Sequence, residues 1–84
     1  MDVLEQVVAM IATIMGKEKE EIKAEDNFKE TLVMDALDST ELILGLEESF
    51  GIEISDDVAD NLETVQDLVT FITEAINIES GDGE

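Results

Sequence analysis

The fold is decided by residues 35–54, which read DALDSTELILGLEESFGIEI. When this stretch is wound as a helix, with about 100° between successive residues, one side of the wheel collects the residues that we expect to face the core: Ser39, Leu42, Ile43, Leu46 and Phe50. Asp35 is suited to cap the first turn, with Asp38 three residues on, and Gly51 is suited to end the last turn. The stretch therefore predicts a helix over 36–50, followed by a short extended connector at 52–54.

The opposite side of the same wheel carries Leu37 and Leu44 among polar and acidic residues: Thr40, Glu41, Glu47 and Glu48. Leucines in this position add nothing to a core, and scattered exposed leucines are common in proteins. The same pattern is also typical of a docking surface, in which leucines supply contact area and carboxylates attract the Arg and Lys side chains of a partner. The residue pattern alone leaves both interpretations open.

Three further helices are predicted on either side of this stretch. Apolar residues recur at helical spacing over 3–15, and Gly16 follows as a C-cap: Leu4, Val7, Val8, Ile11, Ile14 and Met15. Ser55, with Asp56 and Asp57 behind it, predicts a short helix to about Asn61. Thr64 is the expected cap of the last helix, whose buried stripe is Val65, Leu68, Val69, Ile72 and Ile76.

A long loop at residues 17–34 separates the first two helices, with a short turn expected near residues 19–22. Its apolar residues are the expected anchors to the helices: Ile22, Phe28, Leu32 and Val33. The elements together predict an all-α fold, a small four-helix bundle of three longer helices and one short one, with a long loop between the first and second. We expect residues 1–78 to form this single domain and residues 79–84 to form a flexible acidic tail.

The composition excludes several classes of function. Among 84 residues there is no cysteine and no histidine, so a thiolate metal site is excluded and the commonest general base is missing. With 23 acidic residues against four lysines the formal net charge is −19, which repels nucleic acid and anionic lipid and attracts basic protein patches. Because the N-terminus lacks a basic signal region and no apolar run reaches roughly 18 residues, we expect a cytoplasmic monomer with no membrane span.

Residues 35–54 resemble the signature helix of bacterial type II acyl carrier proteins, in which the pattern begins Asp-Ser-Leu-Asp and continues through Glu-Leu to Leu-Glu-Glu and Phe. The resemblance covers nearly the whole chain, since it includes Phe28 in the loop, the acidic short helix after Ile54, and the Thr64-Val65 start of the last helix. It implies a carrier and not an enzyme. In that family a serine bears 4′-phosphopantetheine through a phosphodiester, and the thiol of this arm carries acyl chains as thioesters between enzymes of fatty-acid or polyketide type.

The same resemblance implies the site residues. The arm would attach at position 36, between Asp35 and Leu37. Basic patches of acyl-processing enzymes and of phosphopantetheinyl transferase would meet the acidic helix at Asp35, Leu37, Asp38, Thr40, Glu41, Leu44, Glu47 and Glu48. The acyl chain would lie between the helices, against Val7, Phe28, Leu42, Ile43, Leu46, Ile54, Ala59, Leu62, Leu68 and Ile72.

This chain departs from the family pattern at the attachment position, where it has Ala36. An alanine has no oxygen to accept the phosphopantetheinyl group, so residue 36 cannot be modified. Ser39 follows three residues later in a sequence that imitates the attachment motif, but the wheel turns it toward the core, where its hydroxyl is expected to bond back to the preceding turn. Position 36, at the first helical residue, is therefore the expected attachment position.

Three hypotheses follow for the function. The favoured one is a carrier made unmodifiable by an engineered serine-to-alanine change, since the acidic partner face is intact. The second is a natural carrier-like protein with an interaction or regulatory role and no arm. The third is a weak divalent-cation site at Asp56, Asp57, Asp60 and Glu63, although no glycine-centred calcium loop is present. The pathway served and the length of the acyl chain are not encoded in these patterns.

Overall fold

The computed structural model describes residues 2–81 and confirms the all-α fold. Four α-helices occur in the order α1 (Val3–Met15), α2 (Ala36–Phe50), α3 (Asp56–Asn61) and α4 (Val65–Gly81). The expected turn in the long loop is a 3-10 helix, η1 (Lys19–Glu21). Three helices are long and α3 is short, as the sequence pattern predicts.

The predicted capping residues begin and end the helices. The Asp35 carboxylate accepts a hydrogen bond from the Asp38 backbone N–H at 2.8 Å, and the Ser55 hydroxyl accepts one from Val58 at 3.3 Å. These contacts satisfy amide groups that have no partner within their own helix. Gly16 and Gly51 end α1 and α2 with φ of 68° and 66°, in the left-handed region where a residue without Cβ is unstrained.

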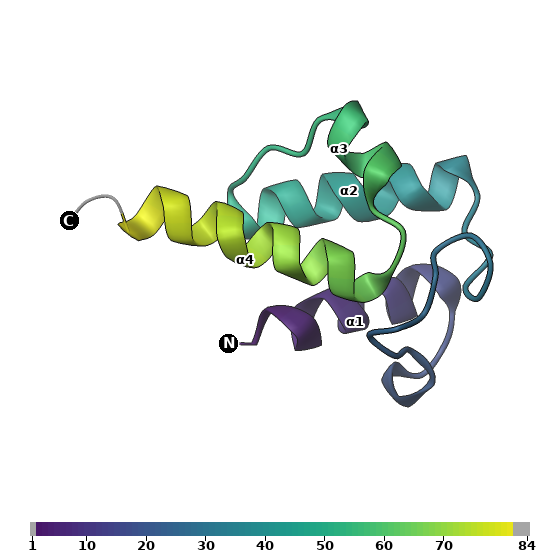
Figure 1. Ribbon diagram of the computed structural model, residues 1–84. Helices are drawn as coiled ribbons and strands as arrows, with labels where there is room; N and C mark the ends of the chain where they lie inside the picture. Colours follow the sequence, from purple (N-terminus) through teal and green to yellow (C-terminus); the bar gives the residue numbers. More distant parts are fainter. Residues whose placement is uncertain (1, 82–84) are drawn as a thin grey trace.

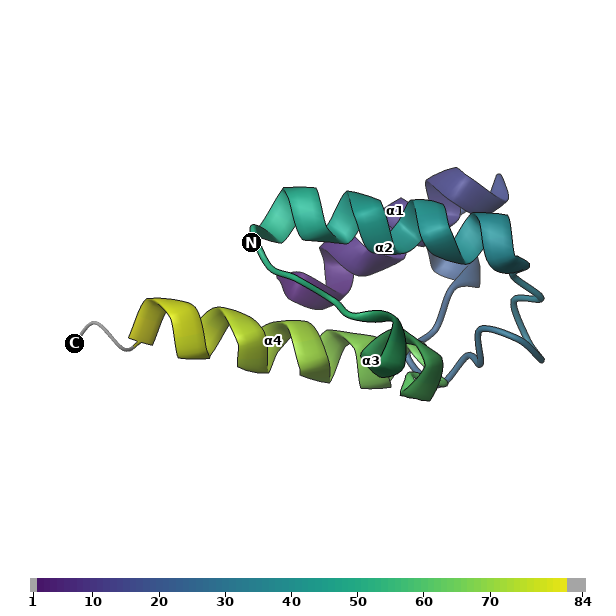
Figure 2. The same ribbon diagram turned by 90° about the horizontal axis from the view of Figure 1, so that it is seen from above.

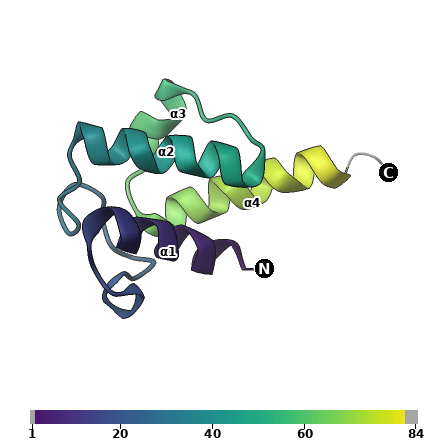
Figure 3. The ribbon, with the colours of Figure 1, turned by 180° about the vertical axis from the view of Figure 1, so that it is seen from behind.

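The three long helices lie alongside one another, with α1 packed against both α2 and α4 (Figure 1). Figures 2 and 3 show that α3 covers the opposite side of the bundle from α1, across α2 and the beginning of α4. The connector at residues 51–55 runs from the end of α2 back to α3. The long loop between α1 and α2 closes the end of the bundle that is opposite the two termini.

The core lies between α1, α2 and α4, and its six largest fully buried side chains come from these three helices: Val7, Ile11, Leu46, Val65, Leu68 and Ile72. The loop adds Ile22 and Leu32 to this core, as predicted. Val33 was expected to be the neighbouring anchor, and this prediction is wrong. Its side chain is 70% exposed, and Met34 takes the buried place at 8% exposure, because Val33 has a left-handed backbone with φ of 55°.

The long loop is held to the start of α4 by backbone hydrogen bonds. Asn27 and Thr64 form an antiparallel β-bridge, and Phe28 N–H donates to the Glu63 carbonyl at 2.9 Å. Val65 N–H donates to the Asp26 carbonyl at 3.0 Å. The Asp26 side chain is 8% exposed and accepts a hydrogen bond from Lys23 N–H at 2.8 Å. Through these bonds a polar loop is fixed where its few apolar side chains reach the helices.

The backbone of α4 continues as helix to Gly81, past the expected boundary at residue 78. The remaining part of the predicted tail, residues 82–84, lies outside the described residues. The division at residue 78 stays a prediction.

Replacing Asp26 is expected to destabilise the fold. Asp26→Ala removes the acceptor of the Lys23 amide inside the loop, which should lower the free energy of unfolding by about 1–3 kcal/mol. Urea denaturation followed by circular dichroism measures this change. Glu25→Ala is the matched control, because it removes the same charge from an exposed neighbour. An equal effect of the two changes would contradict a structural role for Asp26.

Candidate functional site

An open pocket of about 830 Å³ lies between α2, α3 and the long loop. Its apolar lining comes from every element around it: Phe28 and Met34 from the loop, Leu42 and Ile43 from α2, Ile54 from the connector, Ala59 from α3, Leu62 before α4, and Leu68 from α4. Its polar lining includes Ser39, Thr40 and Glu47 of α2 and Asp56 and Asp60 of α3. The pocket is therefore apolar in part and edged by acidic and hydroxyl side chains.

Ala36 lies on the lining of this pocket, at the first residue of α2. Asp35 precedes it as the N-cap and fixes the direction of the first turn through its bond to Asp38 N–H. Both Asp35 and Ala36 are exposed. Position 36 is thus reachable from solvent and at the same time adjoins the space between α2 and α3.

Seven of the ten residues that the family resemblance implies for an acyl-chain lining also line this pocket. These are Phe28, Leu42, Ile43, Ile54, Ala59, Leu62 and Leu68. The other three expected residues, Val7, Leu46 and Ile72, do not line it and lie in the core between α1, α2 and α4. The helical wheel cannot separate these two groups, since a wheel shows which side of a helix is apolar but not how deep a neighbouring helix reaches.

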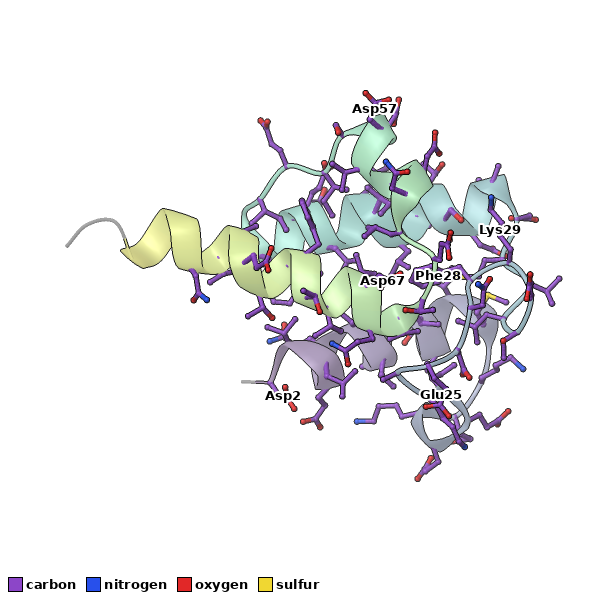
Figure 4. All side chains as sticks on the ribbon, viewed as in Figure 1. Asp2, Glu25, Phe28, Lys29, Asp57 and Asp67 are labelled. Atoms are coloured by element: carbon purple, nitrogen blue, oxygen red, sulfur yellow. The ribbon has the colours of Figure 1, made fainter. Side chains whose placement is uncertain are left out.

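Several lining residues were missed by sequence reasoning. Met34 lines the pocket in place of Val33, the expected anchor. Lys29 is the one basic residue among those that line the pocket, and Figure 4 shows it close to the first turn of α2. No periodic pattern marks a loop residue such as Lys29, so only the loop's path brings it to the pocket.

Ser39 is half-buried and also lines the pocket. The wheel therefore turns it inward correctly but overstates its burial. The expected bond from its hydroxyl back to the preceding turn is not among the side-chain hydrogen bonds of residues 2–81, whereas Thr13 makes such a bond to the Ala9 carbonyl at 3.0 Å. Ser39 thus lies deeper along the pocket wall than exposed Ala36, one helical turn farther from the start of α2.

The outer face of α2 is exposed as predicted. Leu37 is 67% exposed and Leu44 is 54% exposed. Thr40, Glu41 and Glu48 are exposed beside them, and Asp38 at the first turn is half-buried. The two leucines and the surrounding carboxylates form one continuous helical face, because residues three, four and seven positions apart share a side of a helix.

Glu47 differs from the other acidic residues of α2. It is half-buried, and its Oε2 accepts a hydrogen bond from Ile54 N–H at 2.7 Å. This bond ties the connector to α2 and sets the position of Ile54, which lines the pocket. Glu47 therefore holds one wall of the pocket, in addition to any role at the partner face.

The acidic side chains of α3 do not gather into a group that could bind a cation. Asp57 lies on the outer side of α3 (Figure 4), while Asp56 and Asp60 line the pocket. In the part of the chain that the structure describes, no three acidic side chains are grouped so that they could hold a metal ion. None of the described helices is long and apolar enough to cross a membrane.

Two comparisons with known proteins bear on this site. A family model described as a phosphopantetheine attachment site matches residues 5–72. The chain is also similar to a protein of Thermosynechococcus vestitus named acyl carrier protein, with 44% identity over 75 residues, which is 89% of this chain and 93% of that relative. The family-model match runs from the first turn of α1 through the long loop, α2 and α3 into α4, so it covers the pocket and the outer face of α2.

Removing the Glu47 carboxylate is expected to loosen the connector. Glu47→Ala should lower the free energy of unfolding by about 1–3 kcal/mol, because Ile54 N–H loses a charged acceptor in a half-buried place. Faster amide hydrogen exchange at Ile54 would report the same loss locally. Glu48→Ala, an exposed neighbour with the same charge, is the matched control. Unchanged exchange at Ile54 in Glu47→Ala would contradict the assignment.

Proposed function

The chain belongs to the acyl carrier protein family, non-catalytic proteins that carry acyl intermediates, and from this premise we propose that residue 36 is its attachment position. Alanine at this position leaves a carrier that keeps its recognition face and its pocket but has no covalent arm. The observation that carries the proposal is the location of Ala36, which is exposed at the first residue of α2 and adjoins the pocket.

The chemistry of the side chain decides what can be attached. A phosphodiester to the protein needs a side-chain oxygen, and the methyl group of Ala36 has none. The residues present therefore do not fit covalent phosphopantetheine at position 36. Asp35 and Leu37, its neighbours, would border the attachment position in a serine-bearing form. Because alanine is the best helix former, the first turn of α2 tolerates this residue without loss of structure.

The pocket supports storage of an acyl chain as part of the same function. Its apolar lining is contributed by the loop, by all three of α2, α3 and α4, and by the connector, so a hydrocarbon chain inside would be removed from water on several sides. A chain attached at position 36 would begin at the pocket's edge. The acidic residues Glu47, Asp56 and Asp60 on the lining favour an uncharged chain over a free fatty acid, because they would repel its carboxylate.

The outer face of α2 supports recognition by basic partners. Leu37 and Leu44 offer apolar contact area, and the surrounding carboxylates would attract Arg and Lys side chains during encounter. We assign this face to acyl-processing enzymes of fatty-acid or polyketide type and to phosphopantetheinyl transferase, with the chain acting in the cytoplasm as a monomer. An engineered serine-to-alanine change accounts best for an intact face beside an unmodifiable position.

A second candidate rests on the same pair of observations. If alanine at 36 is native, an intact partner face without an arm fits a carrier-like protein that binds the carrier's enzymes and regulates them. The residue encoded at position 36 in the native gene separates the two cases, since serine there favours engineering and alanine favours regulation.

Restoring serine is expected to restore modification. Ala36→Ser, incubated with a phosphopantetheinyl transferase and coenzyme A, should gain the mass of the phosphopantetheine arm, and the unaltered chain should gain none. Mass spectrometry of the intact protein measures both.

The control separates position 36 from Ser39. The double variant with Ala36→Ser and Ser39→Ala should still be modified, because Ser39 lies deeper on the pocket wall. Modification of the unaltered chain, or loss of modification in the double variant, would place the arm at Ser39 and overturn the proposal.

A further inference from the structure

Val33 has a backbone conformation that valine rarely adopts. Its φ is 55°, and among the described residues it is the one residue other than glycine with a positive φ. A left-handed conformation brings Cβ too close to the following carbonyl, and a β-branched side chain makes this worse. Strain of this kind persists only when the surrounding structure imposes it, and it concentrates at functional positions.

The loop imposes this conformation through its own hydrogen bonds. Thr31 N–H and Leu32 N–H both donate to the Asn27 carbonyl, at 3.0 and 2.9 Å, and Met34 N–H donates to the Phe28 carbonyl at 2.9 Å. Leu32 and Met34 are both buried, while Val33 between them is 70% exposed. A glycine would meet this geometry without strain. The valine contributes nothing to the core, so its side chain needs another explanation.

The exposed large apolar residues of the described chain are Val33, Leu37 and Leu44. Leu37 and Leu44 share one face of α2, two helical turns apart, and Val33 precedes Leu37 by four residues, a span of at most about 14 Å even in an extended chain. All three therefore lie along α2 and the turn that leads into it. Among residues 2–77, whose side-chain exposure the structure describes, no other large apolar side chain is exposed in this way.

The charge around these three residues determines which kind of surface can bind over them. Asp35, Glu41 and Glu48 are exposed on the same helix and its cap, and α2 has no basic residue. A second copy of the chain would bring another net charge of −19 against this face, and an anionic lipid surface would be repelled in the same way. A protein surface with an apolar hollow bordered by Arg and Lys complements both the apolar residues and the carboxylates.

We propose that Val33 is a third apolar anchor of the docking face formed by Leu37 and Leu44, and that it inserts into an apolar hollow of a basic protein partner. The inference rests on the proposed function of α2 as the docking face. It extends that face from the helix onto the preceding loop. It also explains why a strained valine occupies a position suited to glycine. The contact area that valine adds in the complex compensates for the strain that it costs the fold.

The test uses the Ala36 chain, whose complex with a phosphopantetheinyl transferase does not turn over and so can be measured at equilibrium. Val33→Gly and Val33→Asn both remove the apolar side chain, and both residues accept a left-handed backbone. Isothermal titration calorimetry should show at least about a fivefold loss of affinity, the size expected for an anchor residue. The midpoint of urea unfolding should stay the same or rise, because the strain is relieved.

Leu37→Ala separates failure of this inference from failure of the proposed docking face. If Leu37→Ala weakens binding and both Val33 variants bind with unchanged affinity, the inference is overturned and the docking face stands. If Leu37→Ala also leaves affinity unchanged, the docking face is overturned with it. A fall in the unfolding midpoint of both Val33 variants would assign valine a structural role, and a dimer in sedimentation that Val33→Gly dissociates would assign this residue to a contact between two copies.

Discussion

The arrangement of the site depends on the hydrogen bonds that join residues 24–28 of the loop to residues 63–66 at the start of α4. The Asn27–Thr64 bridge and the bonds of Phe28 and Asp26 fix a long polar segment against the bundle. Phe28, Lys29 and Met34 then line the pocket beside α2 and α3. Without these hydrogen bonds, only a few apolar side chains would hold the loop to the bundle, and one wall of the pocket would not be fixed in place.

The second constraint is charge. The chain carries a net charge of −19, and the ion pairs among residues 2–81, Lys17 with Glu21 and Lys19 with Glu5, are exposed contacts near η1. Such pairs contribute little to stability, so burial of the apolar core must hold the helices together against the repulsion of their carboxylates. The carboxylates on the outer face of α2 belong to the same charge, and in the proposed function they attract basic partners.

The pocket and the docking face share α2 but serve different parts of the proposed function. Ala36 lies where they meet, at the first residue of the helix. A partner bound to Leu37 and Leu44 would thus be close to position 36 and to the pocket's edge. Glu47 links the two regions, since it belongs to the acidic helix while its carboxylate holds Ile54 on the pocket wall. In the proposed function, one helix therefore carries both the docking face for partners and the attachment position.

The sequence by itself determined the helices, their caps and the exposed apolar pair of α2. These features depend on local rules: Asp35, Ser55 and Thr64 satisfy the amides of the turns that follow them, and glycine at 16 and 51 accepts a left-handed backbone. That residue 36 is an alanine, with no side-chain oxygen, is likewise a property of the sequence alone. Tertiary structure decided the path of the loop. Hydrogen bonds within the loop turned Val33 outward and Met34 inward, and bonds to the start of α4 fixed the path that brings Lys29 to the pocket. The packing of the helices placed Val7, Leu46 and Ile72 in the core and off the pocket lining. No periodicity within one segment records contacts of that kind, because they depend on where a different segment lies.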